Sequence, residues 1–218
     1  SPMSRGLGDV YKRQIFDSNG NYIGLFGSTP IINPAIIETE PSGNVLVSSD
    51  NGVERFDSNG NYLSQISTIR ARGIAIAPNG NIILTNGDQV QICDNNGNVV
   101  NQFGDYGFSN GYFYGTGGVT VASNGNILVT DRLGHRVQIF DSNGNYLSQF
   151  GTLGTGDGEF DTVEGITMNA DGNILVLDWA NDRIQIFDSA CLGLVTDSDG
   201  DGVDAVSYTH LRAHETSE

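Results

Sequence analysis

Short apolar segments alternate along the chain with turn sequences rich in glycine and asparagine. Asn-Gly beside a short alternating segment is a strong β-hairpin signal, because both residues tolerate the positive φ of a tight turn. One turn phrase, of the type FDSNGNY, is complete or shortened at Asp17, Asp57, Asp94, Asp141 and Asp188. A second phrase, of the type NGNILV, lies between successive copies of the first and starts at Pro41, Pro78, Ser123 and Ala170. The pattern predicts antiparallel strands joined by tight turns.

The interleaved phrases define a repeating unit of four strands. The aspartates of the first phrase are 40, 37, 47 and 47 residues apart, and each unit has strands of the types GIxI, NILV, RIQIF and YLSQF. The NILV strand is apolar on both faces, which suits an inner strand covered by neighbouring sheets. Units of this length match the blades of a β-propeller, whereas a sandwich has no such repeat and a one-strand solenoid has a shorter one. We therefore predict an all-β propeller with about four blades.

The connections between units also repeat. The segment that starts at Phe103 aligns without a gap with the segment that starts at Phe150, 47 residues later, and this places Phe113 in register with Phe160. We interpret the segment as the crossover from the outer strand of one blade to the inner strand of the next. Its aromatic side chain is predicted to fill the gap between the two blades.

The unit GEFDTVEGITMNADGNILVLDWANDRIQIFDS, residues 158–189, resembles an NHL repeat. The similarity covers nearly all of residues 15–189. It is most specific in the last two complete units, where Asp131 and Arg136 match the NHL pattern, and weaker in the first two, which lack the Asn-x-Arg element. The resemblance implies a β-propeller, and the propellers of this family commonly have six blades. About four units therefore imply an incomplete, originally six-bladed ring.

Composition and charge narrow the range of partners. The 218 residues include 30 glycines, and 10 basic against 26 acidic side chains give a net charge of −16. A field of this sign repels phosphate backbones, so we expect no nucleic-acid partner. No apolar run approaches the ~20 residues of a membrane-spanning helix, which argues against membrane insertion. The two cysteines, Cys93 and Cys191, fit neither a disulfide framework nor a Cys-x-x-Cys metal site. The sequence gives no indication of the oligomeric state.

The two ends of the sequence do not share the repeat. Residues 1–14 and 207–218 contain four of the ten basic residues and resemble the translated adaptor or vector tails that flank open reading frames from environmental sequencing. Such segments are excluded from fold reasoning. This division predicts propeller blades in residues 15–189 and an Asp-rich linker in residues 190–206. We expect an extracellular or cell-surface protein whose signal peptide was lost by truncation.

Two loops between inner and outer strands form the candidate ligand-binding rim, because propellers bind partners through loops on a rigid frame. Trp179, the only tryptophan, is a candidate anchor for a peptide or stacking surface for a sugar. In the alternative interpretation, the Asp–Arg pairs of these loops brace their own backbone through charge-assisted hydrogen bonds. The candidate residues are Asp131, Arg132, His135, Arg136, Asp178, Trp179, Asn181 and Arg183.

The sequence offers no set of catalytic residues. His135 is the only histidine outside the two predicted tails, whereas a catalytic zinc normally has three protein ligands. NHL-like lyases use metal-bound histidines, which this chain does not supply. No Gly-x-Ser-x-Gly elbow and no pair of catalytic carboxylates with a partner base stands out. We interpret His135 as a polar loop residue, and Cys93, which replaces the phenylalanine of sister units, as a small core residue.

The segment after the last blade has the pattern of a calcium loop. Asp197, Asp199 and Asp201 occupy positions 1, 3 and 5, with a glycine at position 6, so that oxygen ligands converge on a hard cation. The pattern resembles the calcium repeats of thrombospondin type 3 modules and dockerins, and Asp204 at position 8 is a further candidate ligand. Position 12 holds Tyr208, so no bidentate glutamate completes an EF-hand. We predict calcium binding in the millimolar range of extracellular modules; the alternative is a solvated acidic linker.

Two functions fit these observations. The first is a non-catalytic extracellular propeller that binds a protein or a glycan through one rim and continues through a calcium-binding linker into a missing domain. The alternative is a propeller enzyme of the lyase or lactonase type whose active-site residues lie in missing blades. RNA binding, which some NHL proteins show, is disfavoured by the acidic charge.

Overall fold

The computed structural model describes residues 13–16, 18–26 and 31–188. The named elements in these ranges are β-strands and one short 3-10 turn. The described residues belong to two compact units, one up to Ala71 and one from Arg72 onward. Four predicted calcium ligands lie outside the described residues: Asp197, Asp199, Asp201 and Asp204.

The first unit contains a two-stranded hairpin and a four-stranded antiparallel sheet. The hairpin pairs β1 (Arg13–Phe16) with β2 (Tyr22–Phe26), and β1 begins inside the segment predicted as a tail. In the sheet each strand pairs with the next one along the chain. Its strands are β3 (Ile36–Thr39), β4 (Val45–Ser49), β5 (Gly52–Phe56) and β6 (Tyr62–Ser67).

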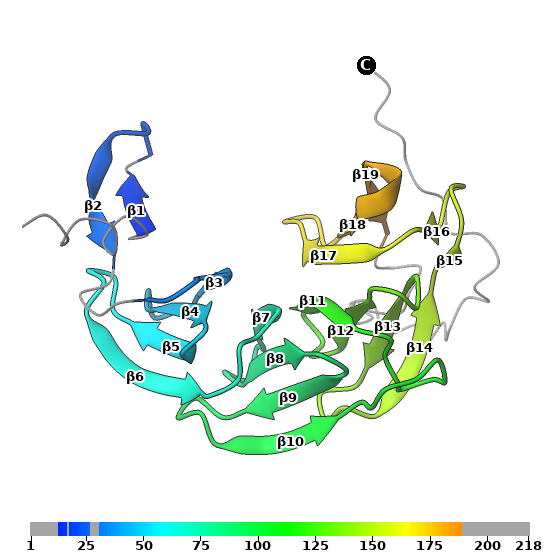
Figure 1. Cartoon of the computed structure of the whole chain (residues 1–218), viewed down its shortest axis with the longest axis horizontal. Helices are drawn as coiled ribbons and strands as arrows, with labels where there is room; N and C mark the ends of the chain where they lie inside the picture. Colours follow the sequence, from blue (N-terminus) through cyan, green and yellow to red (C-terminus); the bar gives the residue numbers. More distant parts are fainter. Residues whose placement is uncertain (1–12, 17, 27–30, 189–218) are drawn as a thin grey trace, which may run out of the picture. The chain divides into compact units, whose positions relative to one another are not determined.

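The second unit contains two four-stranded sheets and one three-stranded sheet, all antiparallel meanders (Figure 1). The first sheet has β7 (Gly73–Ile76), β8 (Ile82–Asn86), β9 (Gln89–Cys93) and β10 (Val99–Phe103). The second has β11 (Thr116–Val121), β12 (Ile127–Asp131), β13 (Arg136–Phe140) and β14 (Tyr146–Phe150). The third has β17 (Val163–Met168), β18 (Ile174–Asp178) and β19 (Arg183–Phe187). These sheets confirm the predicted all-β fold of four-stranded propeller blades.

One feature of the second unit was not predicted from the sequence. The crossover between β14 and β17 contains a short parallel pair, β15 (Thr152–Leu153) and β16 (Glu159–Phe160). The crossover therefore makes a full loop, so that its two short strands run in the same direction before the chain reaches the next blade.

The repeated turn phrase builds the hairpins between third and fourth strands. Oδ1 of Asp57 accepts the backbone N–H groups of Asn59 (2.9 Å) and Asn61 (2.8 Å), and its Oδ2 accepts the side-chain amide of Asn61 (2.8 Å). The glycine of this phrase has a φ of 82°, which explains why glycine recurs there. The same bonds form at Asp94 and Asp141. The phrase thus recurs because one side chain closes each turn.

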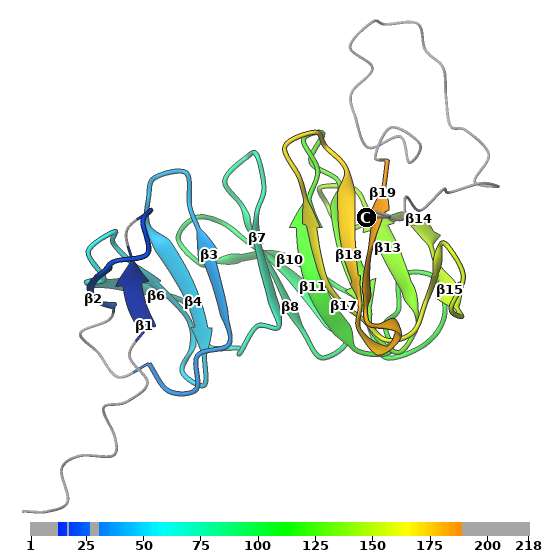
Figure 2. The same cartoon turned by 90° about the horizontal axis from the view of Figure 1, so that it is seen from above.

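Threonine side chains join neighbouring blades of the second unit. Oγ1 of Thr85 on β8 donates to the carbonyl of Gly117 on β11 (2.6 Å), and Oγ1 of Thr130 on β12 donates to the carbonyl of Glu164 on β17 (2.7 Å). A Cβ on Gly117 would lie 2.6 Å from Oγ1 of Thr130, so glycine is needed for this close approach. The three first strands, β7, β11 and β17, consequently lie side by side (Figure 2).

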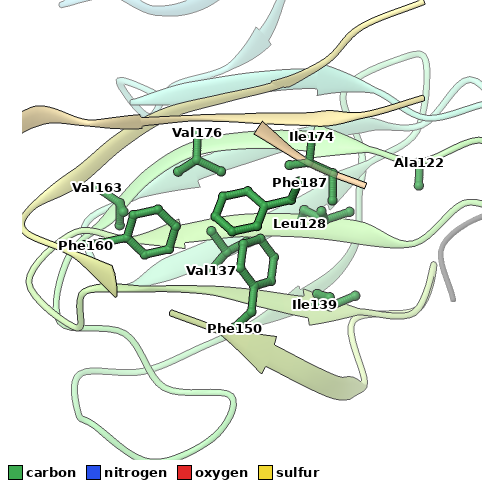
Figure 3. Packing of buried hydrophobic residues seen from close by; sticks show 10 residues of the cluster. All are labelled: Ala122, Leu128, Val137, Ile139, Phe150, Phe160, Val163, Ile174, Val176 and Phe187. Atoms are coloured by element: carbon green, nitrogen blue, oxygen red, sulfur yellow. The ribbon is translucent and has the colours of Figure 1, made fainter. Parts of the chain in front are cut away.

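Three phenylalanine rings pack together in each gap between these blades. In the later gap the ring centroids of Phe150 and Phe187 are 4.9 Å apart and those of Phe160 and Phe187 are 5.7 Å apart (Figure 3). The triads are Phe103, Phe113 and Phe140 in one gap and Phe150, Phe160 and Phe187 in the next. Phe113 and Phe160 are fully buried, which confirms that the crossover aromatic fills the gap.

Cys93 ends β9 at the position where sister blades have phenylalanine, and it is fully buried. Burial raises the pKa of its thiol, so the side chain stays uncharged at neutral pH. The prediction of a small core residue is confirmed.

Candidate ligand-binding rim

Consecutive loops at one end of the second unit are hydrogen-bonded to one another. The loop after β12 bonds to the crossover between β10 and β11 through the N–H of Arg132 and the carbonyl of Gly115 (2.8 Å). It also bonds to the crossover between β14 and β17, because Nδ1 of His135 accepts the N–H of Thr162 (3.2 Å). The loop after β18 bonds to that same crossover through the N–H of Ala180 (3.0 Å). We call this edge the crossover rim.

A buried network centred on Asp131 holds the crossover between β10 and β11. Oδ1 of Asp131 accepts the N–H of Tyr114 (2.7 Å), and its Oδ2 accepts Nε–H of Arg136 (2.8 Å). Arg136 and Gln138 both donate to the carbonyl of Tyr112, at 3.1 and 2.6 Å. Asp131 is fully buried, so these bonds form away from water, where each is stronger.

The same network recurs 47 residues later. Oδ1 of Asp178 accepts the N–H of Asp161 (2.8 Å), and its Oδ2 accepts Nε–H of Arg183 (2.8 Å). Arg183 and Gln185 donate to the carbonyl of Glu159, at 2.9 and 2.7 Å. Each of these five residues is the counterpart of one in the first network, so the brace belongs to the blade repeat itself.

This geometry assigns a bracing role to three of the residues predicted at the rim. Asp131, Arg136 and Asp178 are buried, and their polar atoms bind loop backbone instead of facing solvent. They match the alternative interpretation, in which the Asp–Arg pairs hold their own loops. Arg183 takes part in the same brace, with 26% of its side chain exposed.

The two braces differ in the hydrogen bonds made to the aspartate, and the pKa values of the two aspartates shift in opposite directions. Asn181 donates its side-chain amide to both oxygens of Asp178 (3.1 and 2.9 Å), whereas Gly134 occupies the same place beside Asp131. Burial raises the pKa of Asp131 and outweighs its bonds to Tyr114 and Arg136. Burial acts in the same sense on Asp178, but the hydrogen bonds, with that of Asn181 first among them, outweigh it and lower the pKa.

Arg132 and His135 are also engaged with neighbouring loops. Nε of Arg132 donates to Oε1 of Glu164 at 2.7 Å, and the two groups form a half-buried ion pair. Nδ1 of His135 lies 3.6 Å from Oδ1 of Asp161. His135 has a φ of 53°, so it turns the chain into β13 as well as binding the next crossover. Both predicted rim residues therefore help to position the loops.

Trp179 is the predicted rim residue most open to solvent. It begins the 3-10 turn η1 (Trp179–Asn181), and 62% of its surface is exposed. Its backbone is fixed, since its N–H donates to the carbonyl of Thr162 (3.2 Å). An exposed indole on a fixed backbone can contact a ligand with little loss of conformational entropy.

The structure adds a group of aromatic residues that sequence analysis did not select. Tyr106, Phe108 and Tyr112, in the crossover between β10 and β11, are 61%, 65% and 44% exposed. The rings of Tyr106 and Phe108 pack against Tyr114, with centroids 5.2 and 4.7 Å apart. We call these four residues the aromatic cluster. The sequence could have indicated this cluster. In the gap-free alignment the next crossover has Leu153 and other non-aromatic residues at these positions, so the aromatic residues are specific to this crossover.

Carboxylates border the aromatic cluster. Oδ1 of Asp105 accepts the N–H of Tyr106 (2.8 Å), and Oδ1 of Asp88 accepts the N–H of Gly115 (3.0 Å). Hydrogen bonding to Tyr114 raises the pKa of Tyr106, and the nearby charge of Asp88 acts in the same direction. The surface therefore combines aromatic rings with negative charge.

Within the described ranges, no group of three or more His, Cys, Asp or Glu side chains is arranged to hold a metal ion. No helix in the part of the chain that the structure describes is long and apolar enough to cross a membrane.

Comparison with protein families supports the propeller fold. The sequence model of the family described as DUF5128, 6-bladed beta-propeller, matches residues 117–196. A comparison with curated protein sequences finds no significant match.

Several solved structures are similar in fold. A protein of unknown function from Bacteroides caccae is 16% identical, with a TM-score of 0.56 over 79% of this chain and 67% of that one. A streptogramin B lyase is 17% identical, with a TM-score of 0.59 over 75% of this chain and 54% of that one. A catalytically inactive virginiamycin B lyase from Staphylococcus aureus, solved with quinupristin, is 15% identical, with a TM-score of 0.62 over 82% of this chain and 60% of that one.

These similarities define the class of protein. The chain is a β-propeller built from four-stranded antiparallel blades, and the family model that matches it describes a six-bladed propeller. It spans only 54% and 60% of the length of the two lyases, and identities below a fifth show the fold alone.

Proposed function

We propose that this protein is an NHL-type propeller that binds a protein or a glycan at the crossover rim, without catalysing a reaction. The observation that carries this proposal is the exposed aromatic cluster on a loop held by a buried hydrogen-bond network. Exposed aromatic rings supply large contact areas and are enriched where proteins bind partners. Function on loops supported by a rigid scaffold is the common arrangement in such folds.

Rigidity of the loop favours binding. The Asp131 network fixes the backbone of Tyr112 and Tyr114, and the N–H of Gly111 is held by Oε1 of Gln138 (2.9 Å). Binding of a ligand to the rings therefore loses little conformational entropy, because the loop that carries them is already ordered. The brace binds backbone atoms of this segment, which leaves its aromatic side chains free to face solvent.

Charge restricts the class of ligand. The net charge of −16 and the carboxylates of Asp88 and Asp105 repel polyanions. A neutral glycan can stack on the rings, and a basic peptide can place a cation over a ring beside a carboxylate. Both fit the proposal, whereas a phosphate-rich partner does not.

Replacement of two cluster residues tests the rim. We expect the double variant Tyr106→Leu and Phe108→Thr to lose at least about tenfold in affinity, since a cation over one aromatic ring contributes roughly 0.5–2 kcal/mol and two rings are removed. These replacements are the residues that the next crossover has at the same positions, so the backbone accommodates them. Binding to a panel of neutral oligosaccharides and lysine-rich peptides is measured by biolayer interferometry.

The control for this test is Tyr62→Leu, which removes an exposed ring from the first unit. It should leave binding unchanged. Equal affinities of the native protein and the double variant would contradict the proposal, as would the absence of binding to every probe in the panel.

We also propose that the Asp-rich segment binds calcium and that the protein is extracellular. The support is the spacing of Asp197, Asp199 and Asp201 before a glycine, which suits oxygen coordination of a hard cation. Asp204 adds a further carboxylate to the segment.

Calorimetric titration of the whole chain with calcium tests this site. We expect saturable binding with a Kd of about 0.1–1 mM, the range of extracellular modules. The double variant Asp199→Asn and Asp201→Asn should abolish it, because both lost charges would face the ion. Retention of the heat of binding in this variant, or no binding by the native chain up to ~10 mM calcium, would overturn the proposal.

A further inference from the structure

A cavity lies between two blades of the second unit, away from the crossover rim. It has a volume of about 220 Å³ and opens between the β7–β8 and β11–β12 hairpins. These hairpins join first to second strands, whereas the crossover rim carries the loops at the other end of the second strands. The lining residues are Ala77, Pro78, Asn79, Asn81, Ile83, Ser123, Asn124, Gly125, Ile127 and Ser142.

The polar groups of this cavity are oriented by the hairpins. Oδ1 of Asn79 accepts the N–H of Asn81 (3.0 Å), and Oδ1 of Asn124 accepts the N–H of Asn126 (3.0 Å). These bonds fix both side-chain amides and leave their Nδ2 groups, which have no partner among the described residues, as donors. The lining also includes Ser123, whose hydroxyl both donates and accepts.

Part of the cavity lining is apolar, and it includes two residues of the packed core. Ile83 and Ile127 are each 1% exposed and belong to the packed core between the two blades. Pro78 and Ala77 add apolar surface at the side. A ligand in this cavity therefore meets both apolar carbon and amide or hydroxyl groups.

The lining holds no charged side chain, although the chain as a whole carries a net charge of −16. An ionic ligand would lose hydration without gaining a partner of opposite charge. The volume lies below the 300–1,000 Å³ typical of pockets for drug-sized ligands. A single six-membered ring with several hydroxyl groups matches the size, the neutrality and the mixed lining.

We propose that this cavity binds one small, uncharged, hydroxyl-rich molecule, of the class of a monosaccharide or cyclic polyol. Its hydroxyl groups would pair with the amides of Asn79 and Asn124, while its C–H face packs on Ala77 and Pro78. This site is independent of the crossover rim.

The blade repeat supplies a natural variant of the site. Between the second and third sheets of this unit, the counterpart of Asn124 is Asp171, whose Oδ2 accepts the side-chain amide of Asn169 (3.5 Å). That position therefore offers a charged acceptor instead of an amide donor. The substitution Asn124→Asp reproduces this change with almost no change in shape, and it keeps an oxygen for the N–H of Asn126.

NMR titration of the isotopically labelled protein tests the proposal. The probes are glucose, mannose, N-acetylglucosamine and inositol, added separately. We expect at least one probe to shift the side-chain amide signals of Asn79 and Asn124 saturably, with a Kd of about 1–10 mM as befits so small a ligand. Asn124→Asp should weaken this binding at least tenfold.

Two control variants test whether the probe binds in this cavity. Asn173→Asp, in the corresponding turn of the β17–β18 hairpin, should bind the same probe with unchanged affinity. The rim variant Tyr106→Leu and Phe108→Thr should also bind it unchanged, which separates this site from the proposed function. The proposal is overturned if no probe shifts the two amides, or if Asn124→Asp binds as well as the native protein.

Discussion

The variant Asp131→Ala should lose about 3–5 kcal/mol of unfolding free energy, the usual effect of breaking a buried ion pair by removing one partner. The change leaves Nε of Arg136 and the N–H of Tyr114 without their acceptor in a buried place. The expected loss is a large fraction of the 5–15 kcal/mol by which natural domains are stable. Urea denaturation followed by far-UV circular dichroism measures it.

Comparison with the second brace sharpens this prediction. Asp178→Ala should lose less unfolding free energy than Asp131→Ala. The side chain of its partner Arg183 is 26% exposed, so water can solvate the freed guanidinium, whereas the side chain of Arg136 is only 9% exposed. The control Asp157→Ala removes an exposed carboxylate and should stay within about 0.5 kcal/mol of the native protein. A larger loss for Asp178→Ala than for Asp131→Ala would contradict this account of the braces.

The pKa directions add a dependence on pH. Because burial raises the pKa of Asp131, the unfolded chain gives up this proton at lower pH than the folded one, so its contribution to stability falls as pH rises from about 4 through the folded-state pKa. The lowered pKa of Asp178 acts in the opposite sense, since its contribution is lost as pH falls below about 4. The two aspartates therefore change stability with opposite sign in adjacent pH ranges, Asp131 above about 4 and Asp178 below it.

The blade pattern was predictable because it depends on local chemistry. Each turn is closed by one aspartate, such as Asp57, and by a glycine with positive φ, so the phrase must recur wherever a hairpin recurs. The crossover aromatics, Phe113 and Phe160, were also predictable, because a gap-free repeat keeps the same side chain in the same interblade gap. Local turns and a constant period are both visible in one sequence.

The candidate sites were harder to predict because they depend on contacts between distant segments. The sequence paired Asp131 with Arg136, but it could not show that Asp131 also holds Tyr114, 17 residues away in the preceding crossover. Nor could it show that Tyr106 faces solvent while Phe113, seven residues later, is buried. An aromatic residue satisfies core and surface patterns equally well until neighbouring blades cover one and leave the other.

Phe160→Ala should destabilise the second unit by about 3–5 kcal/mol, as expected when a phenylalanine is removed from a packed core. The ring is fully buried, contacts Phe150 and Phe187, and lies so close to Gly151 that a Cβ there would be 2.4 Å from it. Neighbouring strands are fixed by their ladders and can close the cavity only in part. Thermal unfolding followed by circular dichroism measures the loss.

The size of the replacement side chain distinguishes packing from other causes. Phe160→Leu fills most of the volume and should cost less than half as much as Phe160→Ala, whereas Leu153→Ala, at a 64% exposed position of the same crossover, should stay within about 0.5 kcal/mol of the native protein. Equal effects of the alanine and leucine replacements at Phe160 would refute the packing account.

Because Gln185 donates to the carbonyl of Glu159 (2.7 Å), loss of the ring should also loosen the brace on this crossover. Amide hydrogen exchange should then rise at Gly158, whose N–H is bound by Oε1 of the same glutamine (2.9 Å).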